Sequence, residues 1–270
     1  MKITFLGGGN MANALIGGML KQGFAAADIT VIDPGSEARA KLAQAYAVNC
    51  LETANTLASV GDLLVLAVKP QQMKEAVAAL VGKLGEAVVV SIAAGLDLAT
   101  LSRFLGGHRR IVRCMPNTPA LIGAGITGLC PAPEVDAAGR AAAERVLRAV
   151  GSTVWIADEG KMDGVTALSG SGPAYVFLFI EALQQAAADL GFTPEQGRQL
   201  AIETVQGAAA LAAQSSEPAA LLRERVTSKG GTTEAALKTM AEKGVKEGIV
   251  AGVMAAEARG RELGKLLGAS

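Results

Sequence analysis

The stretch that most constrains the fold lies near the amino terminus, where residues 5–14 read FLGGGNMANA. An apolar run predicts a strand over Lys2–Leu6, and apolar residues at helical spacing predict a helix over Met11–Gln22. Between them Gly7, Gly9 and Ala12 fit the pattern G-x-G-x-x-A, which permits a tight turn, a close approach to a pyrophosphate and close strand–helix packing. We therefore expect a dinucleotide at the amino end of this helix, and the alternative is a glycine-rich turn without a ligand. The residues expected at the phosphates are Gly7, Gly9, Asn10, Met11 and Ala12.

The alternation of strands and helices continues through residues 1–158. Further strands are expected at Ile29–Ile32, Leu63–Val68, Val88–Ser91, Ile111–Cys114, Gly125–Cys130 and Thr153–Ile156, and helices at Gln71–Leu84 and Ala99–Leu105. Strands that alternate with helices pair in parallel, so this part predicts a Rossmann-type, doubly wound parallel sheet.

Residues 159–270 change character, because long Ala-, Leu- and Glu-rich stretches replace the strands. Helices are expected at Pro173–Leu190, Pro194–Gln214, Thr232–Lys243 and Lys246–Leu267. Several of them are apolar on more than one face, which indicates burial in a domain core or in a subunit interface. The second domain is therefore predicted to be all-helical and to carry dimerisation.

Composition limits the partners and the compartment. The chain has 25 basic and 25 acidic residues, and its longest basic run is Arg109-Arg110, so nucleic acid is not an expected partner. No run of 18 apolar residues and no leader pattern occur, so no membrane partner is expected either. Cys50, Cys114 and Cys130 are scattered without metal-ligand spacing, which predicts a cytoplasmic protein with reduced thiols and no metal site.

Asp33 follows the second expected strand, at the position that distinguishes NAD from NADP. A carboxylate there can bind the ribose 2′-hydroxyl and repels a 2′-phosphate, which favours NAD. The alternative is a turn residue before Pro34.

Five further stretches resemble the pyrroline-5-carboxylate reductase family, and the resemblance covers the whole chain. These are AVKP at residues 67–70, SIAAG at 91–95, MPNTPA at 115–120, LSGSGPAY at 168–175 and VTSKGGTTEAAL at 226–237. The resemblance implies reduction of 1-pyrroline-5-carboxylate to L-proline, the last step of proline biosynthesis. It also implies a homodimer or higher homo-oligomer built through the helical domain, with each active site completed between subunits.

The chain departs from the family pattern at two positions. Lys229 replaces the usual proline of the signature, which loosens a turn that keeps its glycines. Asp33 stands where the family more often has a serine or threonine that contacts the 2′-phosphate. The family resemblance implies a preference for NADP(H), and Asp33 argues against it. We therefore expect NADP(H) to be preferred and NAD(H) to be usable as well.

The resemblance also implies a set of cofactor contacts at the ends of the expected strands. Beside the glycine loop and Asp33, they are Asn55, Ala67, Val68, Lys69, Pro70, Ala93, Ala94, Gly95, Asn117 and Pro119. Three alternatives stay open: Lys69 simply closes a strand, Asn55 is an ordinary polar loop residue, and Ser169–Pro173 is only a helix start.

The substrate carboxylate is expected at a glycine-rich turn before a helix, whose backbone N–H groups can point inward. The residues of this site are Ser228, Gly230, Gly231, Thr232 and Thr233. Thr233 is the candidate catalytic residue, because its hydroxyl can hydrogen-bond the ring nitrogen that gains a proton. The alternative is a threonine of a helix cap or first turn. The single histidine, His108, lies in a polar run and is expected to be a surface turn residue.

Two other functions compete. A β-hydroxyacid-type dehydrogenase would place a catalytic lysine in the helix beyond a glycine-rich turn, and residues 170–179 contain none. A non-catalytic dinucleotide-binding regulator would have no need of the Gly230–Thr233 turn, which is intact here.

Overall fold

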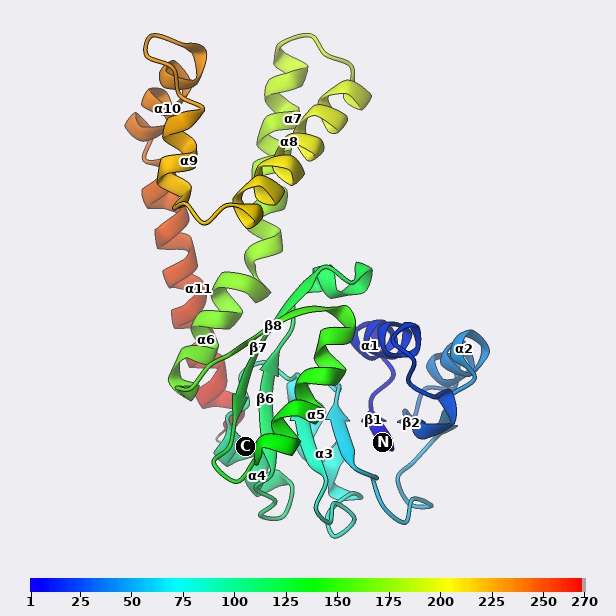
Figure 1. Cartoon of the computed structure of the whole chain (residues 1–270). Coiled ribbons are helices and arrows are strands. Elements are labelled where there is room, and N and C mark those ends of the chain that lie inside the picture. The colour runs from blue at the N-terminus through cyan, green and yellow to red at the C-terminus, as the bar shows by residue number, and fades with distance from the viewer. Residues whose placement is uncertain (269–270) are drawn as a thin grey trace. The chain divides into compact units, whose positions relative to one another are not determined.

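A computed structural model describes residues 1–268, and its amino-terminal part is built on an eight-stranded sheet (Figure 1). The strand order is β3-β2-β1-β4-β5-β6-β7-β8. The bounds are β1 (Ile3–Leu6), β2 (Ile29–Ile32), β3 (Asn49–Leu51), β4 (Leu63–Leu66), β5 (Val88–Ser91), β6 (Ile111–Met115), β7 (Gly125–Pro131) and β8 (Gly151–Trp155).

The first six strands are parallel, and their order reverses at β1. Phe5 of β1 lies opposite Val31 on one side and Val65 on the other. Strands β2 and β3 therefore lie on one side of β1 and the later strands on the other. The connections after β1 and β4 diverge to opposite faces of the sheet, which leaves a crevice between the carboxyl ends of these two strands. The predicted doubly wound sheet is confirmed.

The pairing of β6 with β7 is antiparallel, unlike the parallel pairing expected from the alternation. Gly128 lies opposite Met115 in this pair. The connecting residues 116–124 hold only the short 3₁₀ helix η3 (Thr118–Ile122), and so short a link cannot make a parallel crossover. Helix α5 (Ala137–Leu147) then returns the chain, so that β8 is parallel to β7.

Helices cover both faces of the sheet because each strand of its centre is apolar on both sides. One face packs against α1 (Asn10–Lys21), α2 (Ser36–Tyr46) and α5, and the other against α3 (Met73–Ala78) and α4 (Leu98–Phe104). Two hydrophobic clusters result, with Phe5 and Leu15 fully buried in the first and Leu66 in the second.

The chain forms two compact units. Unit 1 comprises Met1–Ser171 and the residues from Ala256 onward, and unit 2 comprises Gly172–Ala255. The later helical elements are α6 (Met162–Val165), the π-helix η6 (Thr166–Gly170), α7 (Gly172–Asp189), α8 (Pro194–Gln214), α9 (Ala219–Arg225), α10 (Thr232–Glu242) and α11 (Val245–Gly268). The helix α11 therefore begins in unit 2 and ends in unit 1.

Unit 2 is helical and leaves large apolar side chains exposed. On α7, Phe177 is 64% and Leu178 is 66% exposed. The segment Glu159–Asp189 contains an 18-residue window with a mean hydropathy of 1.2, and by length and composition alone it could cross a membrane. Helices that another subunit covers meet the same criteria, so composition alone does not distinguish the two.

Candidate active site

The loops singled out by the sequence lie along one edge of the sheet in unit 1. Because β1, β2, β4, β5 and β6 run in parallel, their carboxyl ends share that edge. The loops that follow them are Gly7–Gly9, Asp33, Ala67–Pro70, Ala93–Gly95 and Met115–Asn117. An open sheet of this type binds ligands at that edge.

The glycine loop packs against the end of β4 at Gly7 and leaves free space at Gly9. Gly7 has φ +101°, and a Cβ there would lie only 2.6 Å from the carbonyl oxygen of Ala67. At Gly9, by contrast, no described atom beyond its immediate chain neighbours and its own helix lies within 4 Å of the position a Cβ would take. The loop therefore touches the end of β4 and leaves free space in front of Gly9.

Helix α1 presents its amino end to that space. Gly9 is its N-cap, no side chain caps the first turn, and no acidic residue lies in it. The first N–H groups of a helix have no partner within the helix, and the helix dipole favours an anion there. The residues present therefore fit the pyrophosphate of a dinucleotide.

Asp33 both braces the loop and closes the turn after β2. Its Oδ2 accepts a hydrogen bond from the N–H of Gly8 at 2.7 Å, and its Oδ1 accepts one from the N–H of Gly35 at 2.8 Å. Arg39 donates from Nη1 to the backbone carbonyl oxygens of Asp33 at 2.7 Å and Pro34 at 2.8 Å. Its Nη2 lies 3.5 Å from Oε2 of Glu52, so the guanidinium fastens the turn after β2 and is paired with that carboxylate. Each carboxylate oxygen of Asp33 keeps a lone pair that a ribose hydroxyl can use.

Lys69 and Asn55 are exposed at the same edge. Lys69 follows β4, which ends at Leu66, and directly precedes the 3₁₀ helix η2 (Pro70–Gln72). The loop of Asn55 is held by Lys83, whose Nζ donates to the carbonyl oxygen of Ala54 at 2.7 Å. Cofactor contacts of both residues stay predictions.

The loop after β5 is packed against the end of α11. Ala93 is buried, and Gly95 has φ +77°. A Cβ on Gly95 would lie 3.2 Å from Cδ1 of Leu267 and 3.7 Å from Cα of Gly264. One side of the loop is therefore filled by the protein itself.

Asn117 fastens the loop after β6 to the π-helix. Its Nδ2 donates to the carbonyl oxygen of Ser169 at 3.2 Å, and its Oδ1 accepts from the N–H of Ile126 at 3.0 Å. A Cβ on Gly170 would lie 2.8 Å from Cε of Met115, so the π-helix and the end of β6 are in close contact. Single π turns are frequent at functional sites. Ser169 and Gly170 thus lie in the π-helix that precedes α7 and contact the end of β6, whereas cofactor contacts of Asn117 and Pro119 stay predictions.

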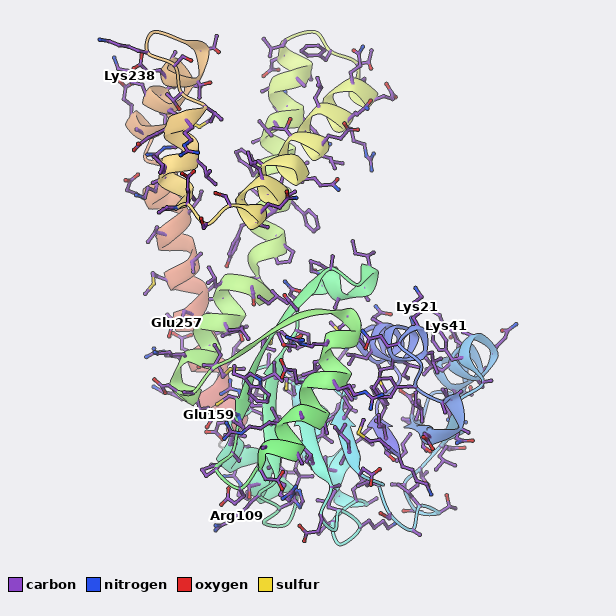
Figure 2. All side chains as sticks on the ribbon, in the orientation of Figure 1. Lys21, Lys41, Arg109, Glu159, Lys238 and Glu257 are labelled. Atoms are coloured by element: carbon purple, nitrogen blue, oxygen red, sulfur yellow. The ribbon has the colours of Figure 1, made fainter. Side chains whose placement is uncertain are left out.

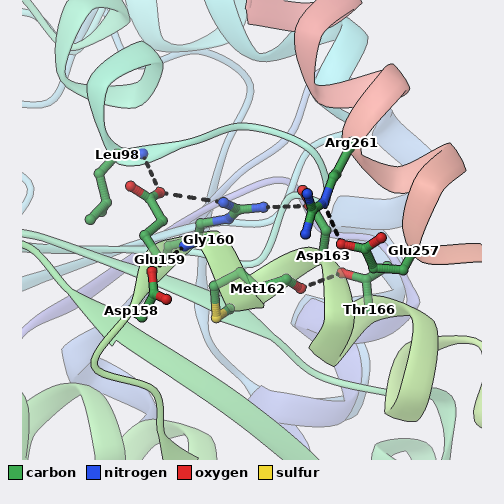
Figure 3. Close-up of polar contacts among 10 residues, drawn as sticks. Leu98, Asp158, Glu159, Gly160, Met162, Asp163, Thr166, Glu257 and Arg261 are labelled. Atoms are coloured by element: carbon green, nitrogen blue, oxygen red, sulfur yellow. Dashed lines mark hydrogen bonds and ion pairs between the residues drawn. The ribbon is translucent and has the colours of Figure 1, made fainter. Parts of the chain in front are cut away.

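A buried arginine of β6 was not recognised from the sequence. The residue Arg113 is 6% exposed, and its guanidinium lies 3.3 Å from Oε1 of Glu159 and 3.1 Å from Oδ1 of Asp163. Figure 3 shows these contacts, together with the hydrogen bond that Glu159 accepts from the N–H of Leu98 at 2.7 Å. Two features of the sequence could have indicated this cluster. One is an arginine inside an apolar strand, two residues before Met115, and the other is a pair of acidic residues four positions apart.

The predicted substrate turn lies in unit 2, where its glycine amides are already bonded within the chain. Gly230 has φ +73° and donates its N–H to Oε2 of Glu234 at 2.7 Å. The N–H of Gly231 donates to the carbonyl oxygen of Ser228 at 3.0 Å.

Gly231 is the N-cap of α10, so Thr232 and Thr233 are its first two residues. Thr233 is therefore not the cap. The N–H groups at these two positions have no partner within a helix, and no side chain caps this end. They are the amides of this turn that a carboxylate can use.

The single histidine lies at the opposite edge of the sheet. Nε2 of His108 is 2.9 Å from the carbonyl oxygen of Ala87, and the two residues precede β6 and β5. Figure 2 shows the neighbouring Arg109 at that end of the sheet. His108 thus lies away from the loops that follow the strands.

The cysteines are free thiols and lie in strands. Cys114 and Cys130 are buried and Cys50 is half-buried. Burial raises the pKa of the Cys114 thiol well above its usual value. A thiol held protonated is a poor nucleophile, so these groups take no part in the proposed chemistry.

Comparison with known families links both units to one enzyme class. Residues 2–95 match the model described as NADP oxidoreductase coenzyme F420-dependent, and residues 159–263 match the model described as pyrroline-5-carboxylate reductase dimerisation. The chain is 45% identical to a pyrroline-5-carboxylate reductase of Pseudomonas aeruginosa, over 99% of this chain and 98% of the relative.

Solved structures agree with the sequence match. A pyrroline-5-carboxylate reductase from Coxiella burnetii is 39% identical, with a TM-score of 0.92 over 97% of this chain and 98% of that one. A Plasmodium falciparum pyrroline carboxylate reductase with NADP bound is 28% identical, with a TM-score of 0.86 over 98% of both chains. A 3-hydroxyisobutyrate dehydrogenase of Mycobacterium tuberculosis is only 15% identical, with a TM-score of 0.52, which indicates a shared fold alone.

Proposed function

The chain belongs to the pyrroline-5-carboxylate reductase family, and we infer that it reduces 1-pyrroline-5-carboxylate to L-proline with a hydride from NAD(P)H. This reaction is the last step of proline biosynthesis. The observation that carries the inference is an identity of 45% over 99% of the chain, a span that includes both the glycine loop and the Gly230–Thr233 turn.

We propose that the dinucleotide binds along the carboxyl edge of the sheet in unit 1. Its pyrophosphate would lie in the open space before Gly9, at the amino end of α1. When bound, the reduced nicotinamide supplies the hydride. The proposed contacts are Gly7, Gly9, Asn10, Met11, Ala12, Asp33, Asn55, Ala67, Val68, Lys69, Pro70, Ala93, Ala94, Gly95, Asn117 and Pro119.

NADP(H) is the preferred cofactor, as the family assignment indicates. At the ribose the carboxylate of Asp33 favours a 2′-hydroxyl. Together with the NADP assignment of the family, this supports use of both NADPH and NADH.

The substrate carboxylate is proposed to bind at the first turn of α10. The N–H groups of Thr232 and Thr233 supply donors, and the dipole of the helix favours the negative charge. Gly230, Gly231 and Ser228 shape the turn through the hydrogen bonds that fix it. A carboxylate anchored there leaves the ring free to be oriented by a side chain.

Thr233 is the proposed catalytic residue. The imine carbon receives the hydride, and the ring nitrogen takes a proton, so the C=N bond becomes CH–NH. The Thr233 hydroxyl would hydrogen-bond the nitrogen and hold the imine in the orientation that hydride transfer needs. A substrate that arrives as the iminium gains orientation from this contact rather than a proton.

We further propose that the enzyme is a homodimer or higher homo-oligomer built through its helical unit. Phe177 and Leu178 of α7 and Ile249 and Met254 of α11 are each more than half exposed in the single chain. A second copy that covers these faces explains them better than a membrane does, because residues 159–263 match a dimerisation model. Each active site would be completed between subunits.

A cytoplasmic location is also part of the proposal. The three cysteines are free thiols rather than disulfides, as expected in a reducing compartment.

A direct spectrophotometric assay of the purified enzyme tests the reaction. NADPH absorbance is followed with 1-pyrroline-5-carboxylate and, for the rival dehydrogenase function, with a β-hydroxyacid and NADP. Thr233→Val should lower kcat/KM for the imine about 30- to 1,000-fold while the Kd for NADPH stays unchanged.

Thr239→Val is the matched control, because the Thr239 hydroxyl donates to the carbonyl oxygen of Ala235 within the same helix. It should leave kcat/KM unchanged. Normal turnover of the Thr233→Val enzyme with a lower Tm would make Thr233 a structural residue of the first turn. Absence of any imine reduction by the wild-type enzyme would refute the function itself.

A further inference from the structure

A closed ring of contacts runs from the loop after β5 through the buried Arg113 guanidinium and the end of α11, and returns to the same loop. We call it the Arg113 ring, and its members are Arg113, Glu159, Asp163, Gly260, Gly264, Gly95 and Leu98. Its starting point and end point is the Ala93–Leu98 segment, which belongs to the proposed cofactor site. The ring lies wholly within unit 1.

The polar half of the ring is made of ion pairs and one backbone hydrogen bond. The side chain of Arg113 is 8% exposed, against 31% for Glu159 and 20% for Asp163. Oε1 of Glu159 accepts from the guanidinium at 3.3 Å and from the N–H of Leu98 at 2.7 Å. Charge-assisted hydrogen bonds to a buried group are strong and fix geometry, so this one oxygen ties the segment after β5 to β6.

The other half of the ring is made by two glycines of α11, whose missing side chains let the helix lie close to Asp163 and Gly95. A Cβ on Gly260 would lie 3.5 Å from Cβ of Asp163, and a Cβ on Gly264 would lie 3.2 Å from the carbonyl oxygen of Gly95. Residues four apart share one face of a helix, so both contacts come from the same side of α11. The loop after β5 is therefore held from two directions.

We propose that Glu159 is a positioning residue, which sets the backbone of Ala93–Gly95 against the dinucleotide by holding the N–H of Leu98. The proposal rests on the proposed function, in which Ala93–Gly95 contacts the cofactor. Asp163 binds the other side of the same guanidinium from α6, at 3.1 Å, without touching Leu98 (Figure 3). An Asp163 variant therefore loses an ion pair of Arg113 but keeps the hydrogen bond between Glu159 and Leu98, so it separates the two effects.

Hydrogen–deuterium exchange of residues 92–98 tests the position of the loop without any cofactor. In Glu159→Ala the amides of this segment should exchange about 10-fold faster than in the wild type, because the anchoring acceptor is gone. In Asp163→Ala they should change less than about 2-fold, although both variants lose one ion pair of Arg113. Glu159→Gln keeps an acceptor for the Leu98 N–H and should restore most of the protection.

Fluorescence titration with NADPH gives the second readout. The Kd should rise about 10-fold in Glu159→Ala and stay within about 2-fold in Asp163→Ala, where a factor of 10 corresponds to about 1.4 kcal/mol. Equal exchange and equal Kd in the two alanine variants, or an unprotected Glu159→Gln, would overturn the positioning role.

Protection of residues 92–98 by NADPH in the wild-type enzyme tests the proposed function separately. If NADPH leaves their exchange unchanged, the cofactor does not contact this loop, and the proposed cofactor site fails at that point. The comparison of Glu159→Ala with Asp163→Ala in the absence of cofactor still decides whether Glu159 holds the loop.

Discussion

Replacing Gly9 by alanine should weaken NADPH binding without weakening the fold. Beyond its chain neighbours and its own helix, the missing Cβ of Gly9 has no described atom within 4 Å, and the φ of −70° at Gly9 suits any residue. An alanine at an N-cap costs about 0.5–1 kcal/mol relative to a good cap, and the lower entropy of the unfolded chain returns about 0.4–1 kcal/mol. The two terms nearly cancel, so the Tm of Gly9→Ala should stay close to that of the wild type.

The same methyl group occupies the space that we assign to the pyrophosphate. If it displaces the phosphates from the amino end of α1, a charged hydrogen bond worth about 1.5–3 kcal/mol is lost, which corresponds to a roughly 10- to 150-fold higher Kd. NADPH fluorescence titration measures this change. Differential scanning fluorimetry of the same samples measures the Tm.

Gly7→Ala is the matched comparison, because there the added methyl group should destabilise the fold, whereas at Gly9 it should weaken only cofactor binding. A positive φ of 101° and a Cβ 2.6 Å from the carbonyl oxygen of Ala67 combine backbone strain with overpacking, together about 2–5 kcal/mol. Gly7→Ala should therefore lower the Tm by many degrees. An unchanged Kd in a stable Gly9→Ala enzyme would refute the placement of the pyrophosphate at Gly9.

Three further predictions concern single groups. Asp33→Ser should lower the KM for NADPH more than the KM for NADH in steady-state assays, because it removes the charge opposed to a 2′-phosphate; equal effects on both would show that Asp33 does not face the ribose. Hydrogen bonds from Thr153, then from Trp155, lower the pKa of Glu144 from 4.5, so the stability they give is present above that value and is lost as pH falls through the folded-state pKa. The Tm difference between wild type and Thr153→Val should accordingly shrink between pH 7 and pH 3, and a constant difference would contradict this reasoning. Glu234→Gln keeps an acceptor for the Gly230 N–H but removes an exposed carboxylate that repels the substrate carboxylate, so the KM for the imine should fall up to about 5-fold, and a rise in KM would show that the charge of Glu234 does not oppose binding.

Local sequence patterns predicted the parts of the fold that depend on neighbouring residues. The strand, glycine loop and helix at residues 2–22 follow from apolar periodicity and from the conformations that only glycine adopts readily. The helix beginning at Pro194 follows from Thr193 as its N-cap and from the proline at its first position, and in the structure Thr193 and Gln196 also exchange hydrogen bonds.

Contacts between distant residues could not be predicted in this way. Arg113 meets Glu159 and Asp163 across separations of 46 and 50 residues, and nothing in the sequence of the strand indicates which carboxylates will face it. The engaged amides of Gly230 and Gly231 were likewise unforeseen, because the glycine pattern predicts a turn but not the hydrogen bonds inside it. The antiparallel β7 is an intermediate case, because the short connection before it is visible in the sequence, whereas the apolar pattern of the strand itself does not indicate its direction.

The passage of α11 from unit 2 into unit 1 also bears on how the protein is made. Unit 1 is discontinuous, because its first 171 residues are completed by residues that follow Ala255. A ribosome synthesises these residues after all of unit 2, so most of the sheet domain emerges well before the helix end that packs on Gly95. The loop after β5 therefore reaches its final surroundings only after unit 2 has been made, and a chain cut within unit 2 lacks one wall of the proposed cofactor site.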